Sequence, residues 1–246
     1  MIRSWLGSIL FALFQAVLTF FFVPFAQCFF WMPPLKRYRL LLIWPRLNLW
    51  AARWFCGIRH RVIGLENLPD LVMPHIVLSK HSSTWEVLCV PLVMPRPLCF
   101  VAKKELLSIP FFGWGLALAK PITIDRSAGG AAMGQIYTQG EARMQEGFWV
   151  ILFPEGTRVS PEQKSRYKTG GARLAATLRV PVIPVAHNAG YLWPRGIFGK
   201  RAGLITLSIG KPISPDGKEP QQLMNEVETW IEAEVKRLGS GLSDHV

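Results

Sequence analysis

The first 65 residues of this chain contain no acidic side chain, although they carry eight basic ones. Only the segment after residue 213 is acidic, with seven acidic and three basic side chains. With a formal net charge of +12, the protein is expected to seek an anionic partner. Nucleic acid, anionic lipid head groups and small phosphorylated molecules all qualify, because they share the same Coulombic attraction.

Cysteine and histidine are sparse and are not spaced as metal ligands. The four cysteines form no CxxC pair, and Cys28 lies inside an apolar run. This pattern argues against a disulfide framework and against a zinc site, so we expect reduced thiols and no metal or other cofactor. The chain also lacks a G-x-S-x-G elbow, a P-loop and internal repeats. Its 246 residues, half of them hydrophobic, suffice for one sizeable core and an accessory segment.

The N-terminus contains a long uncharged run. Residues 5–32 are almost wholly apolar and exceed the ~20 residues that a helix needs to cross hydrocarbon. The run is too long for a secretory signal, so we interpret it as a retained membrane anchor, with a buried core helix as the alternative. Pro24 is expected to interrupt the helix, which leaves open a kinked span or a hairpin-like insertion into one leaflet.

Basic and aromatic residues follow this run. Residues 40–60 mix Leu, Trp and Phe with arginines, a composition typical of a helix in the membrane interface. We therefore expect residues 1–57 to form an anchor with interfacial helices in contact with membrane lipids. The basic residues at 36–46 predict that the downstream domain faces the cytoplasm. We do not expect nucleic acid as a partner, because the aromatic residues concentrate here and do not interleave with the later basic residues.

From residue 58 to residue 246, short β-branched or aromatic runs alternate with helical segments. The expected strands lie in residues 61–69, 75–80, 98–103, 121–126, 148–154, 180–187 and 204–211. The expected helices lie in residues 84–92, 129–146, 170–178 and 220–238. This alternation predicts an α/β domain whose mostly parallel central sheet is flanked by helices.

The first candidate site is KHSSTWE, in which His81 follows an expected strand and Glu86 lies five residues later. A hydroxyl nucleophile needs a base, and imidazole, with an unperturbed pKa of about 6.5, suits that role. Glu86 could fix the imidazole tautomer if His81 lies in the turn before the helix, because five residues along one helix point about 140° apart. Alternatively, Ser83 and Glu86 form a capping box, and spacing leaves both readings open.

The second candidate site is the loop after the expected strand at 148–153. Its polar residues are Glu155, Gly156, Thr157 and Arg158. Loops at the carboxyl ends of strands bind ligands in α/β sheets, and an arginine offers donors matched to phosphate oxygens. Three further cations follow neighbouring expected strands: Lys103, Lys104 and Arg126. Together these residues predict a cationic pocket, although each cation alone is more often a solvated surface charge.

Four blocks occur in the same order as in the glycerophospholipid acyltransferase family: His81 to Glu86, the arginine after ITID, FPEGTR at 153–158 and VPVIPVA at 180–186. Within that family, the chain most resembles the 1-acylglycerol-3-phosphate acyltransferases. The resemblance covers about residues 58–211. It implies that His81 and Glu86 form a catalytic dyad of the H-x4-D type, and that residues 180–185 support the acyl-donor side. It also implies that Arg126 and the block 155–158 hold a phosphate. The family usually has aspartate at the position of Glu86, so a shift of helix or rotamer must absorb the extra methylene.

The resemblance further implies transfer of a fatty acyl group from acyl-CoA or an acyl carrier protein to the free hydroxyl of a lysophospholipid acceptor, 1-acylglycerol-3-phosphate. The product would be phosphatidic acid, made at the cytoplasmic face of the cytoplasmic membrane. Lys103 or Lys104 would assist in holding the phosphate. The alternatives are another acceptor, such as glycerol-3-phosphate or a lyso-aminolipid, and a noncatalytic lipid-binding protein. Residues 103–120 would line an acyl-chain groove, press into the bilayer or form core.

Overall fold

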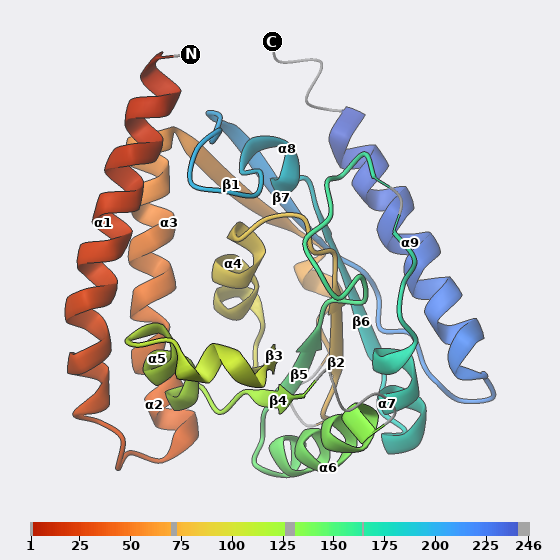
Figure 1. The fold of residues 1–246 in the computed structure, drawn as a ribbon. Helices are drawn as coiled ribbons and strands as arrows, with labels where there is room; N and C mark the ends of the chain where they lie inside the picture. The colour runs from red at the N-terminus through yellow and green to blue at the C-terminus, as the bar shows by residue number, and fades with distance from the viewer. Residues whose placement is uncertain (1, 70–72, 126–130, 164, 241–246) are drawn as a thin grey trace.

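The computed structural model describes residues 2–69, 73–125, 131–163 and 165–240. At its centre lies a seven-stranded sheet with the order β1-β7-β6-β2-β5-β3-β4 (Figure 1). The strands are β1 (Ile58–Ile63), β2 (Ile76–Ser79), β3 (Leu98–Lys103), β4 (Ile122–Ile124), β5 (Trp149–Leu152), β6 (Val182–His187) and β7 (Gly203–Ile209). Among the strand pairs of the described residues, β6–β7 alone is antiparallel. The predicted α/β class with a mostly parallel sheet is confirmed.

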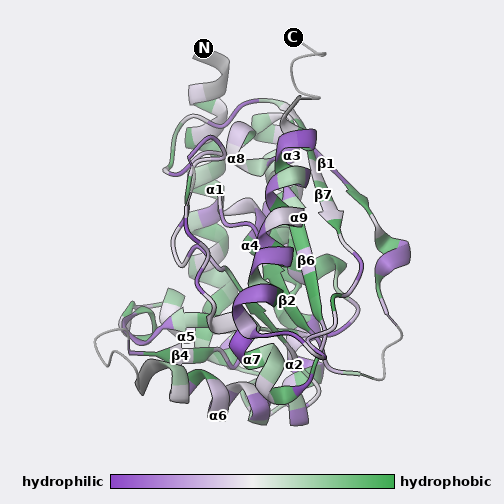
Figure 2. Cartoon of the chain, turned by 90° about the vertical axis from the view of Figure 1, so that its right-hand side faces the viewer, coloured by the Kyte–Doolittle hydropathy of each residue, from purple (hydrophilic) through white to green (hydrophobic). Residues whose placement is uncertain are grey.

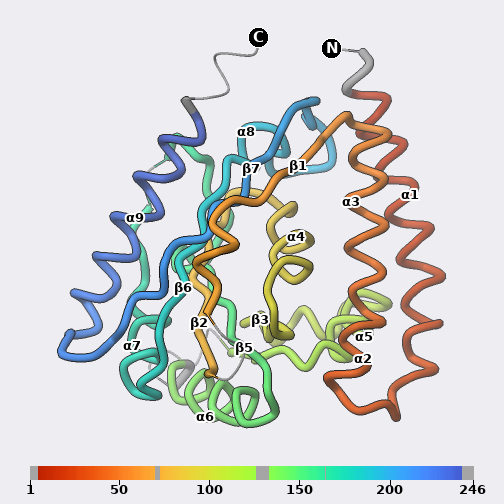
Figure 3. Tube along the Cα trace, turned by 180° about the vertical axis from the view of Figure 1, so that it is seen from behind, coloured from red at the N-terminus to blue at the C-terminus, as the bar shows by residue number. Residues whose placement is uncertain are grey.

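Helices cover both faces of the sheet. They are α1 (Ile2–Gln27), α2 (Pro34–Leu41), α3 (Ile43–Cys56), α4 (Trp85–Val93), α5 (Phe112–Leu118), α6 (Ala131–Gln145), α7 (Gly170–Leu178), α8 (Ala189–Leu192) and α9 (Pro220–Ser240), with short 3-10 turns η1 (Leu65–Asn67) and η2 (Lys104–Ser108). Helix α9 packs on β6 and on α7, whereas α4 lies on the opposite side and is backed by α3 and α1 (Figures 1 and 3). The sheet is therefore enclosed between two helical layers.

The strands β2, β5 and β6 are buried along their whole lengths. Strands covered on both faces read as continuous Val, Ile and Leu runs, which is why these three stood out in the sequence. Helix α9 buries one apolar stripe against them, including Leu223, Val227 and Ile231, and turns hydrophilic bands outward (Figure 2).

The N-terminal helices depart from two predictions. Helix α1 continues through Pro24 to Gln27, so the expected interruption is wrong, and the chain reverses only afterwards. Helices α2 and α3 then return alongside α1 (Figure 3). The expected interfacial helix stops at Cys56 because Gly57 adopts the left-handed conformation (φ 68°) that ends helices, and the residues after it join β1.

Within α1, the 23 residues Trp5–Gln27 are long and apolar enough to cross a membrane. Most large side chains of this segment are exposed, as in Leu13, Val17 and Phe21. Secondary structure changes from helix to strand at Gly57, but the division into an anchor (1–57) and a separate α/β domain (58–246) stays a prediction.

Two loops meet at the carboxyl edge of the parallel strands. Strands β2 and β5 are neighbours, with Leu78 opposite Leu152, so the segments that follow them emerge side by side. Strand β3 lies on the other side of β5 and ends at the same edge with Lys103. This is the edge at which α/β sheets bind ligands.

Candidate active site

His81 and Glu86 are in direct contact. His81 lies in the turn between β2 and α4, and Glu86 is the second residue of α4. The Nδ1 atom of His81 is 2.8 Å from Oε1 of Glu86, whose side chain is fully buried. The turn before the helix thus brings the two side chains together, as the dyad requires.

The capping-box reading of Glu86 holds in part, because Ser83 Oγ accepts from the N–H of Trp85 and not from that of Glu86. The same Oε1 atom accepts a hydrogen bond from the backbone N–H of Ser83 (3.2 Å), and Ser83 Oγ accepts one from Trp85 N–H (3.1 Å). Glu86 therefore caps the start of α4 and contacts His81 with one oxygen. The cap fixes the carboxylate and thereby the imidazole that it faces.

The surroundings of His81 hold its ring in one orientation. A carboxylate only accepts hydrogen bonds, so Nδ1 carries the proton toward Glu86 and Nε2 is left for a substrate. The ring stacks on Phe153, with centroids 4.0 Å apart and planes inclined by 17°. The backbone N–H of His81 donates to Glu155 Oε1 (3.3 Å), and its carbonyl accepts from Val159 N–H (2.8 Å). The 153–159 loop thus makes three contacts with His81.

Glu155 lies behind this loop, which does not fit the expected contact with a phosphate. Its buried carboxylate is 3.2 Å from Nζ of Lys80, and Lys80 also contacts Glu232 of α9 at 2.6 Å. Burial raises the pKa of the Glu155 carboxyl, and the Lys80 ammonium opposes that rise. A carboxylate would also repel a phosphate. Glu155 therefore supports the turn that carries His81.

A cavity of about 1200 Å³ opens beside His81. Four further predicted residues line it: Lys103, Gly156, Thr157 and Arg158. Arg158 is oriented by a 2.7 Å hydrogen bond from Nη1 to Thr84 Oγ1, one turn residue before α4. Lys104 is exposed and is not among the lining residues, and Arg126 lies outside the residues that the structure describes.

Three more cations line the cavity and were missed in the sequence: Lys168, Arg173 and Arg195. Gly156 adopts φ 71°, and a Cβ atom there would lie 2.9 Å from Lys168 Nζ, so this loop and this lysine approach closely because the residue is glycine. Lys168 could have been suspected from the sequence only because it lies just before the expected helix at 170–178. Arg195 follows no predicted element, so only the fold brings it to the site.

Part of the cavity lining is apolar and comes from the N-terminal helices, from β3 and from the segment that follows β3. Its walls include Phe22, Val23, Trp44, Phe100, Leu106 and Leu116. In the segment 103–120, Leu106 and Leu116 line the cavity, Leu118 is buried, and Ile109 and Trp114 are exposed. One cavity is therefore lined by the imidazole of His81, by a group of cations and by apolar side chains.

Comparison with known proteins gives the family. A model described as Acyltransferase matches residues 59–188. The chain is 41% identical over 218 residues to the 1-acyl-sn-glycerol-3-phosphate acyltransferase of Pseudomonas aeruginosa, covering 87% of this chain and 81% of that protein. Its identity to the alpha enzyme of that name from Mus musculus is 34% over 144 residues, covering 58% of this chain and half of that one.

A solved structure supports the fold. The crystal structure of the 1-acyl-sn-glycerophosphate acyltransferase PlsC from Thermotoga maritima matches with a TM-score of 0.79 and 24% identity, covering 97% of both chains. The resemblance inferred from the motifs is confirmed, because the family model spans more than half of the chain and the Pseudomonas aeruginosa relative matches most of it. The chain belongs to the acyltransferase family and is an enzyme of that class.

Proposed function

We propose that the protein transfers a fatty acyl group from an acyl thioester to the free hydroxyl of 1-acylglycerol-3-phosphate, giving phosphatidic acid. The observation that carries this proposal is one cavity that is lined by His81, by Arg158 and by a group of apolar side chains. Such a space suits a molecule with a hydroxyl, a phosphate and an acyl tail. Two named relatives act as 1-acyl-sn-glycerol-3-phosphate acyltransferases, which favours the same acceptor here.

In the proposed reaction, Nε2 of His81 accepts the proton of the acceptor hydroxyl. The oxygen attacks the thioester carbonyl, and the collapsing tetrahedral intermediate expels a thiolate, which takes the proton back from His81. Glu86 stabilises the imidazolium that exists between these two steps. Because the acceptor itself attacks the thioester, no acyl-enzyme intermediate is required.

The acceptor phosphate would be held by the cations of the cavity, chiefly Arg158 and Lys168, with Lys103 at the end of β3. The hydrogen bond to Thr84 orients the Arg158 guanidinium before substrate arrives. A role for Arg126 remains part of the proposal through the family resemblance alone. The acyl tail would lie along the apolar end, between α1 and β3.

The protein would reach its lipid substrates by lying on the cytoplasmic membrane with its catalytic domain on the cytoplasmic side. Helices α1 and α3 expose large aromatic side chains, including Phe21, Trp50 and Trp54. Helix α1 also packs along α3 and α5, and Phe11 packs edge-on against Trp193. Because α1 packs on the rest of the protein along much of its length, we favour its insertion into one leaflet. A helix that crossed the membrane would have to separate from these packing partners.

The experiment is an acceptor panel with purified protein and a labelled acyl donor, offered either as acyl-CoA or as acyl carrier protein. We expect labelled phosphatidic acid from 1-acylglycerol-3-phosphate and little product from glycerol-3-phosphate or a lyso-aminolipid. In Arg158→Ala, the KM for the acceptor should rise roughly 10- to 100-fold, as expected for losing one charged hydrogen bond.

The matched control is Arg166→Ala, since Arg166 is exposed and is not among the described residues that line the cavity. Its KM should stay at the parent value. A preference for a lyso-aminolipid without phosphate recognition, or equal KM values in both variants, would refute the proposed acceptor.

A further inference from the structure

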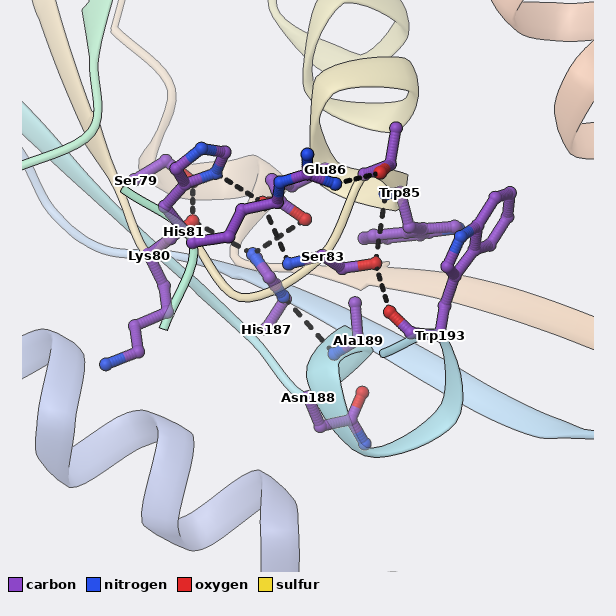
Figure 4. A network of polar contacts seen from close by, with 12 residues as sticks. Ser79, Lys80, His81, Ser83, Trp85, Glu86, His187, Asn188, Ala189 and Trp193 are labelled. Carbon is purple, nitrogen blue, oxygen red and sulfur yellow. Dashed lines mark hydrogen bonds and ion pairs between the residues drawn. The ribbon is translucent and has the colours of Figure 1, made fainter. Parts of the chain in front are cut away.

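His187, at the carboxyl end of β6, lies directly behind Glu86 (Figure 4). Its side chain is fully buried, and its Nε2 atom is 3.6 Å from Oε2 of Glu86. The buried imidazole is therefore on the opposite side of the carboxylate from His81. No motif in the sequence pointed to this residue, since it ends a strand assigned only to general support of the donor side.

Hydrogen bonds define the protonation of the His187 ring. Backbone N–H of Ala189 can only donate, and it points at Nδ1 (3.2 Å), so Nδ1 is the unprotonated acceptor. The proton of the neutral ring is then on Nε2, which donates to the carbonyl of Lys80 (3.0 Å). Burial lowers the pKa of His187, opposed by the Glu86 carboxylate, so the ring is neutral near pH 7.

The two oxygens of Glu86 have different environments. Oε1 accepts from His81 and Ser83, whereas Oε2 is buried and accepts no hydrogen bond from any described residue. A buried carboxylate oxygen without a donor is costly, because it has left water and gained nothing in return. The N–H of His187, already directed at Lys80, lies close enough for its dipole to act on Oε2.

We propose that His187 is a positioning residue that acts through Glu86: its Nε2–H stabilises the ionised carboxylate and keeps Oε1 directed at His81. The longer glutamate side chain fits this arrangement, because its carboxylate lies between two imidazoles and the Ser83 backbone. The inference rests on the proposed role of His81 as the base. The charged groups that face His187 are Glu86, His81 and the neighbouring Lys80.

The consequence is a defined shift in pH dependence. The active form contains ionised Glu86 and neutral His81. Without the His187 N–H, the Glu86 carboxylate interacts more strongly with the protonated imidazole of His81, so His81 gives up its proton, and the active form appears, only at higher pH. The acid limb of the kcat–pH profile should therefore move to higher pH when the donor is removed.

The test compares His187→Leu with His187→Gln. Both variants remove the ring acceptor of the Ala189 N–H, but only glutamine retains an N–H donor near the Nε2 position. His187→Leu should lower kcat about 10- to 100-fold, the range seen when an outer hydrogen-bond partner of a functional group is lost. The KM of His187→Leu should stay within about twofold of the parent value, and the acid limb of its kcat–pH profile should move to higher pH. The acid limb of His187→Gln should stay at the pH of the parent.

A third variant guards against a folding defect in His187→Leu. The amide of His187→Asn is one methylene shorter than that of glutamine and should not reach Glu86, so this variant should behave like His187→Leu. Equal losses in the asparagine and glutamine variants, or an unchanged kcat and limb in His187→Leu, would overturn the proposal.

A second readout does not depend on turnover. Diethyl pyrocarbonate modifies neutral imidazole, and peptide mass analysis resolves His81 from the other histidines. The midpoint pH of His81 modification should rise in His187→Leu and stay constant in His187→Gln. A parent protein that makes no phosphatidic acid would refute the proposed function, whereas identical modification midpoints in all variants would refute the role of His187.

Discussion

At the scale of single residues, the site depends on how the Glu86 carboxylate is held. Its Oε1 atom accepts hydrogen bonds from a backbone N–H just before α4 and from the imidazole of His81, so the helix start and the proposed catalytic pair share one atom. The family usually has an aspartate here. In this structure the longer glutamate side chain is fully buried, and its carboxylate lies between the imidazoles of His81 and His187. The imidazole orientation is thus set by the backbone of the turn.

Replacing Glu86 should separate charge from geometry. Glu86→Gln keeps a side-chain oxygen for the cap but loses the negative charge that stabilises the imidazolium, so kcat should fall about 10³-fold or more, by analogy with the loss of a triad carboxylate. Glu86→Asp keeps the charge but withdraws it by one methylene, and its kcat should fall less. Steady-state kcat with saturating acceptor is the measurement. A glutamine variant more active than the aspartate variant would speak against a charged partner for His81.

At the scale of secondary-structure elements, a cluster of ion pairs joins α9 to the turn that carries His81, with Lys80 and Glu155 buried and Glu232 partly exposed. Lys80 directly follows β2, Glu155 follows β5 and Glu232 comes from α9. Tyr167 donates a hydrogen bond to Glu232 at 2.7 Å. Through this cluster the C-terminal helix holds the residue that precedes His81. Removing one member of a buried pair is costly because the other charge is left without a partner.

Lys80→Met should therefore destabilise the protein by about 3 kcal/mol, which corresponds to a loss of about 6–12 °C in Tm. Burial already raises the pKa of Glu155 from 4.5, and losing the ammonium raises it further. A raised carboxyl pKa destabilises as pH rises through it, so the Tm deficit should be larger at pH 8 than at pH 5. Thermal unfolding in detergent at both values measures this.

The matched control for that variant is Lys218→Met, because both side chains of the Lys218–Glu226 pair keep contact with solvent, with exposed fractions of 24% and 44%. An exposed pair contributes under about 1 kcal/mol. The Tm of the control should change little at either pH. If the Tm of Lys80→Met were lowered by the same amount at both pH values, the loss would not come from a Glu155 carboxylate left without its cation.

Much of this element structure could be predicted from the sequence. Buried strands such as β5 and amphipathic helices such as α9 carry strong periodic signals, and both were expected within a few residues of their bounds. The start of β1 was misread as helix because its arginines continue the composition of α3. The continuity of α1 through Pro24 was missed because local rules do not include the packing that supports the helix on α3 and α5.

At the scale of the whole molecule, the N-terminal helices expose large apolar side chains and also line the cavity. Helix α3 exposes Trp50 and Trp54 one turn apart, with exposed fractions of 53% and 68%. Exposed aromatic residues of this size beside a basic N-terminus suit a membrane interface. The same helices form one wall of the cavity, so lipids would enter from the side that contacts the membrane.

The double change Trp50→Ser, Trp54→Ser should weaken binding to anionic vesicles at least about tenfold, equivalent to ~1.4 kcal/mol. Activity on acceptor dispersed in detergent should remain. Leu65→Ser is the control, since Leu65 is similarly exposed but belongs to η1. Vesicle sedimentation measures both, and comparable binding of all three proteins would locate the membrane contact elsewhere.

The site was less predictable than the fold. His81, Glu86 and Arg158 were found because each belongs to a short local motif. Lys168, Arg195 and His187 belong to none, and they reach the site only through the order in which the strands assemble. For Glu155 the motif was recognised and a phosphate contact was predicted. Nothing in the sequence indicated that the side chain would be buried against Lys80.

The central claim is that one imidazole activates the acceptor hydroxyl, and a single-turnover measurement on His81→Gln tests it most directly. With enzyme in excess over labelled acyl-CoA and with saturating 1-acylglycerol-3-phosphate, the parent should form labelled phosphatidic acid. His81→Gln should bind the acceptor with unchanged affinity and lose at least about 10²- to 10⁴-fold in rate, the usual contribution of a general base. A His81→Gln enzyme that turns over at the parent rate would contradict the account.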